Sequence, residues 1–329
     1  MQKQDHEIVL SPSGHTFTVE PGETILEAAL RSGYAVNYHC ANGTCGDCRA
    51  RIVEGVVAEH QPYDYVFKGE DRNQPMLLMC RSIPGSDMTI EVSEANSVED
   101  IPHQEIVTQV MNRNFLSDEI AELQLRTPRS QTLRFLAGQQ VKLNFNGVGE
   151  ITKPIASCPC NGRDLIFHFY RQDSDPVTDL VFGQLKTREN VNIAGPYGEF
   201  VLRQPFGEKI TFVAYETGFA PVKSLIEYAL SLDMALPIEL LWLASGSRWH
   251  YLENQCRAWK DVITNFNFEL IVTDCLKPGE AGQPGCLDRM LDNLLGKIEG
   301  ADLYVAGPDA LTDALKRNCH IRHLQSLPQ

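Results

Sequence analysis

The chain has 329 residues, of which 43% are hydrophobic and 22% charged, and its formal net charge is −14. This length is enough for two or three domains, each with its own core. No stretch approaches the ~18 uninterrupted apolar residues of a membrane span. Residues 1–10 lack the basic and apolar regions of a signal peptide, so we expect a cytoplasmic protein. The acidic balance argues against nucleic-acid binding, which requires a basic surface.

Residues 1–95 are expected to form a first domain of strands, one helix and a cysteine-rich loop. Apolar runs at 7–10 and 16–19 flank a Ser-Pro-Ser-Gly turn, which predicts a β-hairpin. Apolar side chains at helical spacing predict a helix over 24–31, and Gly33 is its expected stop. Further strands are expected at 50–57 and 88–92. This order indicates a β-grasp domain, followed by a linker at 96–104.

Residues 105–205 predict an antiparallel β-barrel, because short apolar strands alternate with turn signals. Its strands are expected at 105–110, 120–126, 140–145, 164–170 and 191–193. From 206 to 329 strands alternate with helices, which predicts a doubly wound parallel sheet. Here strands are expected at 210–214, 238–244, 268–272 and 303–306, and helices at 221–232, 250–260, 285–295 and 309–318. The expected fold is therefore multi-domain, with an α+β part followed by an α/β part.

The strongest motif in the chain is formed by Cys40, Cys45, Cys48 and the distant Cys80. The spacing C-x4-C-x2-C with a later fourth cysteine is typical of plant-type [2Fe–2S] clusters. Three thiolates can come from one loop only if its backbone curls closely round the cluster, and glycines at 43 and 46 allow this. A structural zinc site is the alternative, but zinc favours two C-x2-C pairs and the chain has only one here. We therefore predict an iron–sulfur cluster, with one-electron transfer as its chemistry.

The other cysteines show no ligand-like grouping apart from one C-x-C pair. They are Cys158, Cys160, Cys256, Cys275, Cys286 and Cys319. In a cytoplasmic chain such residues are more often buried thiols than disulfides. We accordingly expect buried thiols at Cys158 and Cys160.

Three further motifs resemble those of one protein family. Residues 195–200 read Gly-Pro-Tyr-Gly-Glu-Phe, residues 217–224 read Thr-Gly-Phe-Ala-Pro-Val-Lys-Ser, and residues 306–308 read Ala-Gly-Pro. Together with the domain order, they make nearly the whole chain similar to ferredoxin-type reductases of oxygenase systems, and most similar to the CDP-6-deoxyhexose reductase-like group. The resemblance implies that NAD(P)H passes a hydride to FAD. The flavin then delivers single electrons through the cluster to a partner oxygenase or another acceptor.

The resemblance also assigns cofactor contacts to particular residues of this chain. FAD contacts are expected at Lys153, Ile155, Ser157 and Thr178. NAD(P)H contacts are expected at Thr217, Gly218, Gly307 and Pro308.

Several flavin contacts of the family are missing from this sequence. The family has Arg-x-Tyr-Ser before its Ile-Ala-Ser run, where residues 151–154 are Ile-Thr-Lys-Pro. Lys153 offers a positive charge, but without the two-pronged geometry of arginine. Ser174 and Asp175 replace two glycines of the diphosphate-binding turn, whereas Thr178 keeps a hydroxyl. The resemblance therefore implies weaker flavin binding than in the family.

The nucleotide motifs are altered in the same way. Tyr215 and Glu216 replace two glycines, and Glu216 would repel a phosphate. Ala306 replaces the family cysteine near the nicotinamide. An arginine expected at 245 is a serine, unless Arg248 serves in its place. Residues 323–329 lack the aromatic segment that often covers the flavin.

Two functional hypotheses remain open on the sequence alone. The first is an NAD(P)H-dependent flavoprotein reductase with an atypical flavin site. The second is an electron-transfer or scaffold subunit that keeps the cluster but has lost flavin or nucleotide binding. Residues 1–100 carry seven Lys and Arg against sixteen Asp and Glu. This excess suits docking to a basic partner surface, or simply a solvated acidic surface.

Overall fold

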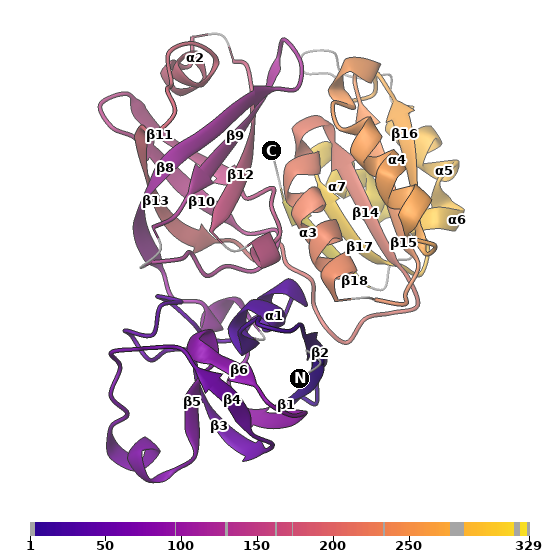
Figure 1. The fold of residues 1–329 in the computed structure, drawn as a ribbon. Coiled ribbons are helices and arrows are strands. Elements are labelled where there is room, and N and C mark those ends of the chain that lie inside the picture. The colour runs from indigo at the N-terminus through magenta and orange to yellow at the C-terminus, as the bar shows by residue number, and fades with distance from the viewer. Residues whose placement is uncertain are drawn as a thin grey trace.

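Three sheets organise the chain in the computed structural model (Figure 1). The structure describes residues 4–95, 97–128, 131–161, 163–172, 174–232, 234–276, 286–318 and 323–327. The N-terminal unit, in indigo and purple, lies below the antiparallel sheet and the parallel sheet, which stand side by side. None of the helices in these ranges is long and apolar enough to cross a membrane.

The N-terminal sheet is mixed, as a β-grasp domain requires. Its strands are β1 (His6–Ser11), β2 (Thr16–Val19), β3 (Arg49–Glu54), β5 (Met76–Leu78) and β7 (Met88–Glu91), in the order β2-β1-β7-β3-β5. β1 and β7 pair in parallel, while the other neighbours are antiparallel. A separate pair joins β4 (Val57–His60) to β6 (Ser82–Pro84). The single strand predicted at 50–57 is thus wrong, because Gly55 turns the chain at φ +93°.

The helix α1 (Ile25–Arg31) confirms the predicted helix, and its start and stop have local causes. Thr24 and Glu27 form a capping box, in which each side chain bonds the backbone N–H of the other. Gly33 follows the helix at φ +80°, a conformation that glycine adopts without strain. The helix buries Ile25, Leu26 and two alanines against the sheet.

The second sheet is antiparallel and has six strands. They are β8 (Gln104–Phe115), β9 (Ile120–Arg126), β10 (Gln140–Phe145), β11 (Gly149–Pro154), β12 (Asp164–Tyr170) and β13 (Asn190–Tyr197), in the order β11-β10-β13-β8-β9-β12. The sequence missed β11, which is too polar to show a strand pattern but pairs with β10 along its whole length. It also missed the short helix α2 (Pro176–Phe182).

The third sheet is parallel and is covered by helices on both faces. Its strands are β14 (Ile210–Tyr215), β15 (Ile238–Ala244), β16 (Phe266–Val272), β17 (Asp302–Ala306) and β18 (His323–Leu327), in the order β16-β15-β14-β17-β18. One face packs on α3 (Phe219–Ser231) and α4 (Glu253–Val262). The other packs on α5 (Cys286–Asp292), α6 (Leu295–Ile298) and α7 (Asp309–Asn318). The doubly wound prediction is confirmed, although the helix predicted at 285–295 ends at Asp292, and a separate short helix, α6, begins at Leu295.

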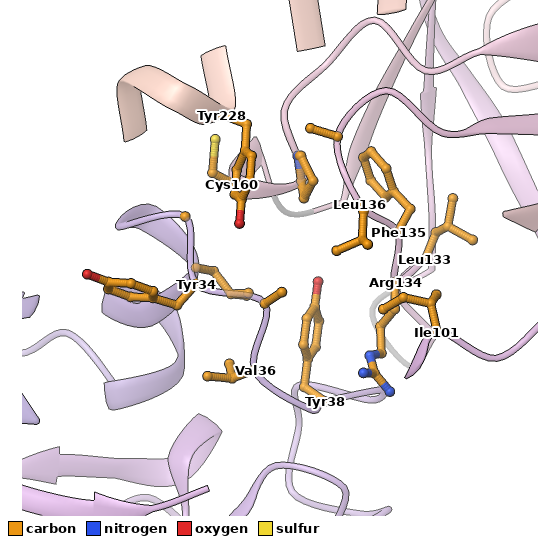
Figure 2. A pocket seen from close by; sticks show the side chains of 15 residues that line it. Tyr34, Val36, Tyr38, Ile101, Leu133, Arg134, Phe135, Leu136, Cys160 and Tyr228 are labelled. Carbon is orange, nitrogen blue, oxygen red and sulfur yellow. The ribbon is translucent and has the colours of Figure 1, made fainter. Parts of the chain in front are cut away.

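The N-terminal unit contacts the other two units through the segment after α1. The Arg134 guanidinium donates to the side chain of Asn37, and the backbone N–H of Thr132 donates to His39 O at 3.2 Å. Between the units lies a cavity of about 30 Å³. Figure 2 shows Tyr38 pointing into it from below, towards Leu136 and Tyr228. The lining of this cavity is mostly apolar.

Candidate functional site

The cysteine loop lies between α1 and β3, and two glycines shape it. Gly43 and Gly46 both have φ +82°, in the left-handed region that favours glycine. A Cβ at Gly43 would lie 2.5 Å from the Cβ of Tyr63, and one at Gly46 would lie 2.1 Å from the ring of Tyr65. The backbone N–H of Tyr65 donates to Gly43 O at 3.0 Å. Both glycines are therefore needed for close packing as well as for the turn.

The four cysteines of the motif form two pairs, three of them from this loop and Cys80 from the 3-10 turn Met79–Arg81. Cys40, Cys48 and Cys80 are buried, and Cys45 is partly exposed. The Sγ atoms of Cys48 and Cys80 lie 3.2 Å apart, although 32 residues separate them in the chain. Cys40 and Cys45 interact as the second pair. This arrangement suits a [2Fe–2S] cluster, which takes four thiolates, two on each iron.

Backbone N–H groups point at the sulfur atoms. Those of Thr44 and Cys45 each lie 3.4 Å from Cys40 Sγ, and that of Asp47 lies 3.4 Å from Cys45 Sγ. Burial opposes ionisation of the Cys40 thiol, but hydrogen bonds, that of Thr44 first, lower its pKa to about 6. The hydrogen bond from Cys48 lowers the pKa of Cys80. The loop thus favours thiolates at these two positions, and thiolate is the form that binds metal.

The pairing also bears on the zinc alternative. A structural zinc ion requires four ligands around one point. The described thiols instead form two pairs, Cys48 with Cys80 and Cys40 with Cys45, and a [2Fe–2S] cluster takes two thiolates on each iron.

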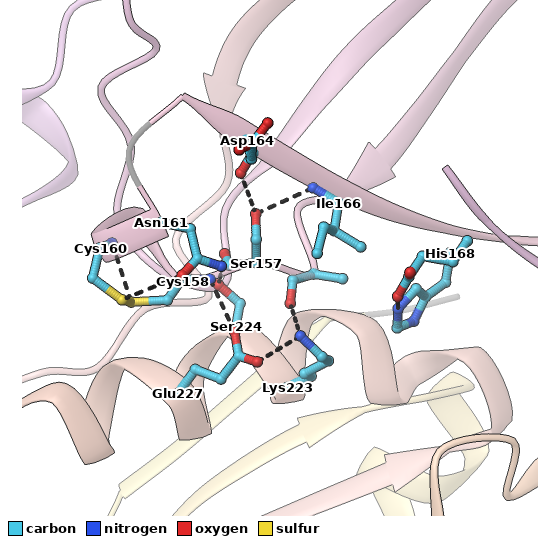
Figure 3. A network of polar contacts seen from close by, with 12 residues as sticks. Ser157, Cys158, Cys160, Asn161, Asp164, Ile166, His168, Lys223, Ser224 and Glu227 are labelled. Carbon is cyan, nitrogen blue, oxygen red and sulfur yellow. Dashed lines mark hydrogen bonds and ion pairs between the residues drawn. A yellow bond between two sulfur atoms is a disulfide. The ribbon is translucent and has the colours of Figure 1, made fainter. Parts of the chain in front are cut away.

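Two of the predicted flavin contacts, Ile155 and Ser157, are fully buried in protein. The Ser157 hydroxyl donates to Asp164 O at 3.3 Å and accepts from the Ile166 N–H at 3.2 Å. Its carbonyl accepts from the Ser224 hydroxyl at 2.7 Å. Figure 3 shows the first two bonds on the side of the antiparallel sheet and Ser224 on α3, from which the third bond comes. Ser157 therefore holds two units together, and its polar atoms are already engaged.

The other two predicted flavin contacts are also engaged by the chain. The Lys153 ammonium stands 5.3 Å from the centre of the Phe169 ring, and burial lowers its pKa. The Thr178 hydroxyl lies 3.0 Å from Asp175 O within the first turn of α2. Asp175 is the N-cap of that helix and accepts from the Val177 N–H at 3.0 Å. The turn that the resemblance assigns to a diphosphate here caps a helix.

The predicted nucleotide contacts meet at the carboxyl ends of β14 and β17. Gly218 faces β17, where a Cβ would lie 2.2 Å from Ala306 O. Gly307 faces β14, where a Cβ would lie 3.0 Å from the Cβ of Tyr215. Thr217 and Pro308 are their neighbours in sequence. Both glycines therefore allow close packing of the chain's own backbone and side chains at the ends of β14 and β17.

The prediction of buried thiols at Cys158 and Cys160 is wrong, because the two form a disulfide. The turn at 159–161 brings their Cα atoms to 5.1 Å, within the range that a disulfide spans. Cys275 and Cys286 are also joined, with Cα atoms 5.7 Å apart. Cys256 is a buried free thiol, and Cys319 lies outside the described residues.

Sequence reasoning missed a cluster that joins the antiparallel sheet to the parallel sheet. His168 Nδ1 lies 3.0 Å from the Tyr251 hydroxyl. The rings of Tyr170 and Trp249 are 5.3 Å apart, edge to face. Because the partners lie about eighty residues apart, the only available signal was the aromatic run Trp-His-Tyr at 249–251.

His168 should make stability depend on pH. Burial lowers its pKa, with Glu122 opposing the shift, so the folded chain binds fewer protons there than the unfolded chain. The contribution of the neutral imidazole to folding stability is fully present above the unfolded pKa of ~6.5. It is lost as pH falls, because the unfolded chain then binds a proton that the folded chain does not. We expect the free energy of unfolding to drop by up to ~1.4 kcal/mol per pH unit below that value.

Chemical denaturation of His168→Gln at pH 7.5 and at pH 5.5 measures this contribution. The loss of stability between the two pH values should be smaller than in the unsubstituted protein. His103→Gln, at an exposed position, is the matched control. An equal effect of both substitutions would contradict the assignment to His168.

Comparison with known proteins agrees with this architecture. Residues 8–85 match the family described as "2Fe-2S iron-sulfur cluster binding domain". The chain is 31% identical to CDP-6-deoxy-L-threo-D-glycero-4-hexulose-3-dehydrase reductase of Yersinia pestis, over 71% of this chain and 70% of that protein. It is 30% identical to the phenol hydroxylase P5 protein of Acinetobacter pittii, over 94% and 88% of the two chains.

A solved structure extends the likeness to the whole fold. The ferredoxin reductase in carbazole 1,9a-dioxygenase superposes with a TM-score of 0.56 at 19% identity, over 99% of each chain. The two sequence relatives each match more than two thirds of this chain, and the solved structure has a similar fold along its whole length. The chain therefore belongs to the family of iron–sulfur electron-transfer reductase components, in which a [2Fe–2S] domain is joined to a ferredoxin–NADP reductase-like module.

Proposed function

We propose that this chain is a cytoplasmic reductase component that passes single electrons through a [2Fe–2S] cluster to a partner oxygenase. Cys40, Cys45, Cys48 and Cys80 hold the cluster. The observation that carries the proposal is the grouping of these thiols in two pairs, where the glycine-shaped loop meets the turn that holds Cys80. A relative named for phenol hydroxylase supports a hydroxylating acceptor.

The partner should present a basic surface to the cluster. Cys45 is the least buried of the four cysteines, so the cluster approaches the surface there. Asp47 lies within the loop, and Asp64 lies between the two tyrosines that pack on it; both are exposed. Opposite charge on a partner would steer it to this face.

The electron source distinguishes two versions of this function. In the first, NAD(P)H and FAD bind at the residues that the resemblance assigns and feed the cluster. In the second, the reductase-like module is a scaffold and the cluster alone carries electrons. The inward hydrogen bonds of Ser157 and Thr178, and the closed packing of Gly218, favour the second version.

Electron transfer to a basic acceptor tests both the cluster and the docking surface. The chemically reduced protein should reduce cytochrome c, used as a probe, with one electron per chain. The rate should fall at least about tenfold between low salt and ~0.5 M salt, because screening removes steering. A rate that does not change with salt would contradict an electrostatic docking surface. A colourless, iron-free protein after anaerobic purification would contradict the cluster itself.

A further inference from the structure

Strand order determines where a dinucleotide would bind in the parallel sheet. β14 is followed in the chain by β15 and β16 on one side, and β17 and β18 lie on the other. The chain therefore reverses direction across the sheet between β14 and β17. In open parallel sheets, ligands bind at the carboxyl ends of the strands flanking such a point.

Glu216 lies at this position, directly after the carboxyl end of β14. It is a non-glycine residue in the left-handed region, at φ +48°, a conformation that side-chain-bearing residues normally avoid. Its carboxylate accepts hydrogen bonds from the backbone N–H and the hydroxyl of Ser245, at the end of β15. Its carbonyl accepts from the Trp242 indole N–H at 3.0 Å. A carboxylate thus lies just after β14 and before the first residue of α3, and its negative charge would repel a phosphate bound at that helix N-terminus.

The antiparallel sheet closes the cleft from the opposite side. His168 and Tyr170 on β12 meet Tyr251 and Trp249, which follow β15. His168 and Trp249 are only 3% and 7% exposed, so this contact is an interior one. At its rim, the Arg248 guanidinium lies 3.0 Å from the carboxylate of Glu119. Arg248 is therefore engaged across the cleft.

We propose that the cleft between the antiparallel and parallel sheets is a closed structural interface that holds neither flavin nor dinucleotide, and that the cluster takes its electrons from a separate one-electron carrier protein. This inference rests on the proposed electron-transfer function and identifies the donor. A [2Fe–2S] cluster accepts one electron, whereas NAD(P)H gives two as a hydride. Without a bound flavin to divide the pair, the donor must release one electron at a time, as a reduced ferredoxin does. The donor is oxidised by one electron, the cluster is reduced by one, and no bond forms or breaks.

The experiment uses the full chain with its cluster assembled. The protein is incubated with FAD, desalted under anaerobic conditions and analysed for flavin. NADH or NADPH is then added, and the cluster absorbance is followed. We expect no flavin to remain bound and no bleaching by either nucleotide. A low-potential ferredoxin, reduced beforehand, should bleach the cluster fully.

Hydrogen–deuterium exchange tests for ligand binding between the two sheets without relying on activity. Peptides covering 164–170 and 246–252 should exchange at the same rate with and without excess FAD and NADH. Protection of these peptides, one flavin per chain after desalting, or bleaching by NADH would each overturn the inference. Failure of photoreduced deazaflavin to reduce the cluster would contradict the proposed function instead, so the two failures are distinguishable.

Discussion

Replacing Cys80 by serine should remove the visible absorption of the cluster and most of its iron and sulfide. Cys80 is buried in a short 3-10 turn and pairs with Cys48. Serine keeps the size of the side chain but does not ionise near neutral pH, so one iron loses half of its protein ligands. Changes to groups that merely support a ligand cost ~10–100-fold in metal affinity, and loss of the ligand itself should cost more.

The control for this prediction is Cys256→Ser. Cys256 is also a buried free thiol, and it packs against the parallel sheet rather than the cysteine loop. This change should cost ~1–3 kcal/mol of stability through burial of a hydroxyl and leave the iron content unchanged. Iron and sulfide assays, with far-UV circular dichroism to confirm folding, measure both variants. Loss of iron in Cys256→Ser with retention in Cys80→Ser would contradict the ligand assignment.

Gly46→Ala should be the most damaging single methyl addition in the cluster loop. The left-handed backbone alone costs an L-residue ~1–2 kcal/mol. The new Cβ would also lie 2.1 Å from the ring of Tyr65, and such overpacking typically costs a further ~1–3 kcal/mol. We expect a lower melting temperature and faster removal of iron by a chelator.

Gly22 offers a matched control, because it has φ +89° with nothing within 4 Å of the added Cβ. Gly22→Ala should lower the free energy of unfolding only by the cost of the left-handed backbone, and it should leave the cluster intact. Tyr65→Ala should be less harmful in the Gly46→Ala background than in the unsubstituted protein, because it removes the overlapping ring. Additive effects of the two substitutions would mean that the ring is not the obstacle.

The parts of the fold that follow from local sequence could be predicted. The helix over 24–31, its stop at Gly33 and the run from Cys40 to Cys48 each depend on residues close together in the chain. The alternation of strands and helices after residue 206 likewise predicted the doubly wound sheet. β11 was missed because half of its residues are polar, and it is a strand only through its pairing with β10.

The closed cleft could not be predicted, because its contacts join distant parts of the chain. His168 and Tyr251 are separated by 83 residues, and neither belongs to a recognised motif. The sequence showed that Glu216 replaces a glycine, but not that its carboxylate bonds Ser245. The sequence shows that ligand contacts of the family are missing. Only the structure shows that the two sheets contact each other through His168, Tyr251 and their neighbours.

The strand pairing of the N-terminal unit has a consequence for biosynthesis. All four cysteines and every strand of their sheet lie between β1 and β7, so the sheet can close once residue 91 has left the ribosome. α3, which anchors the rest of the molecule through Ser224 and Ser157, is translated much later. At ~5–20 residues per second, the delay is roughly 7–27 s. Iron and sulfide can therefore reach the cysteine loop on a nascent chain, before the neighbouring units exist to cover it.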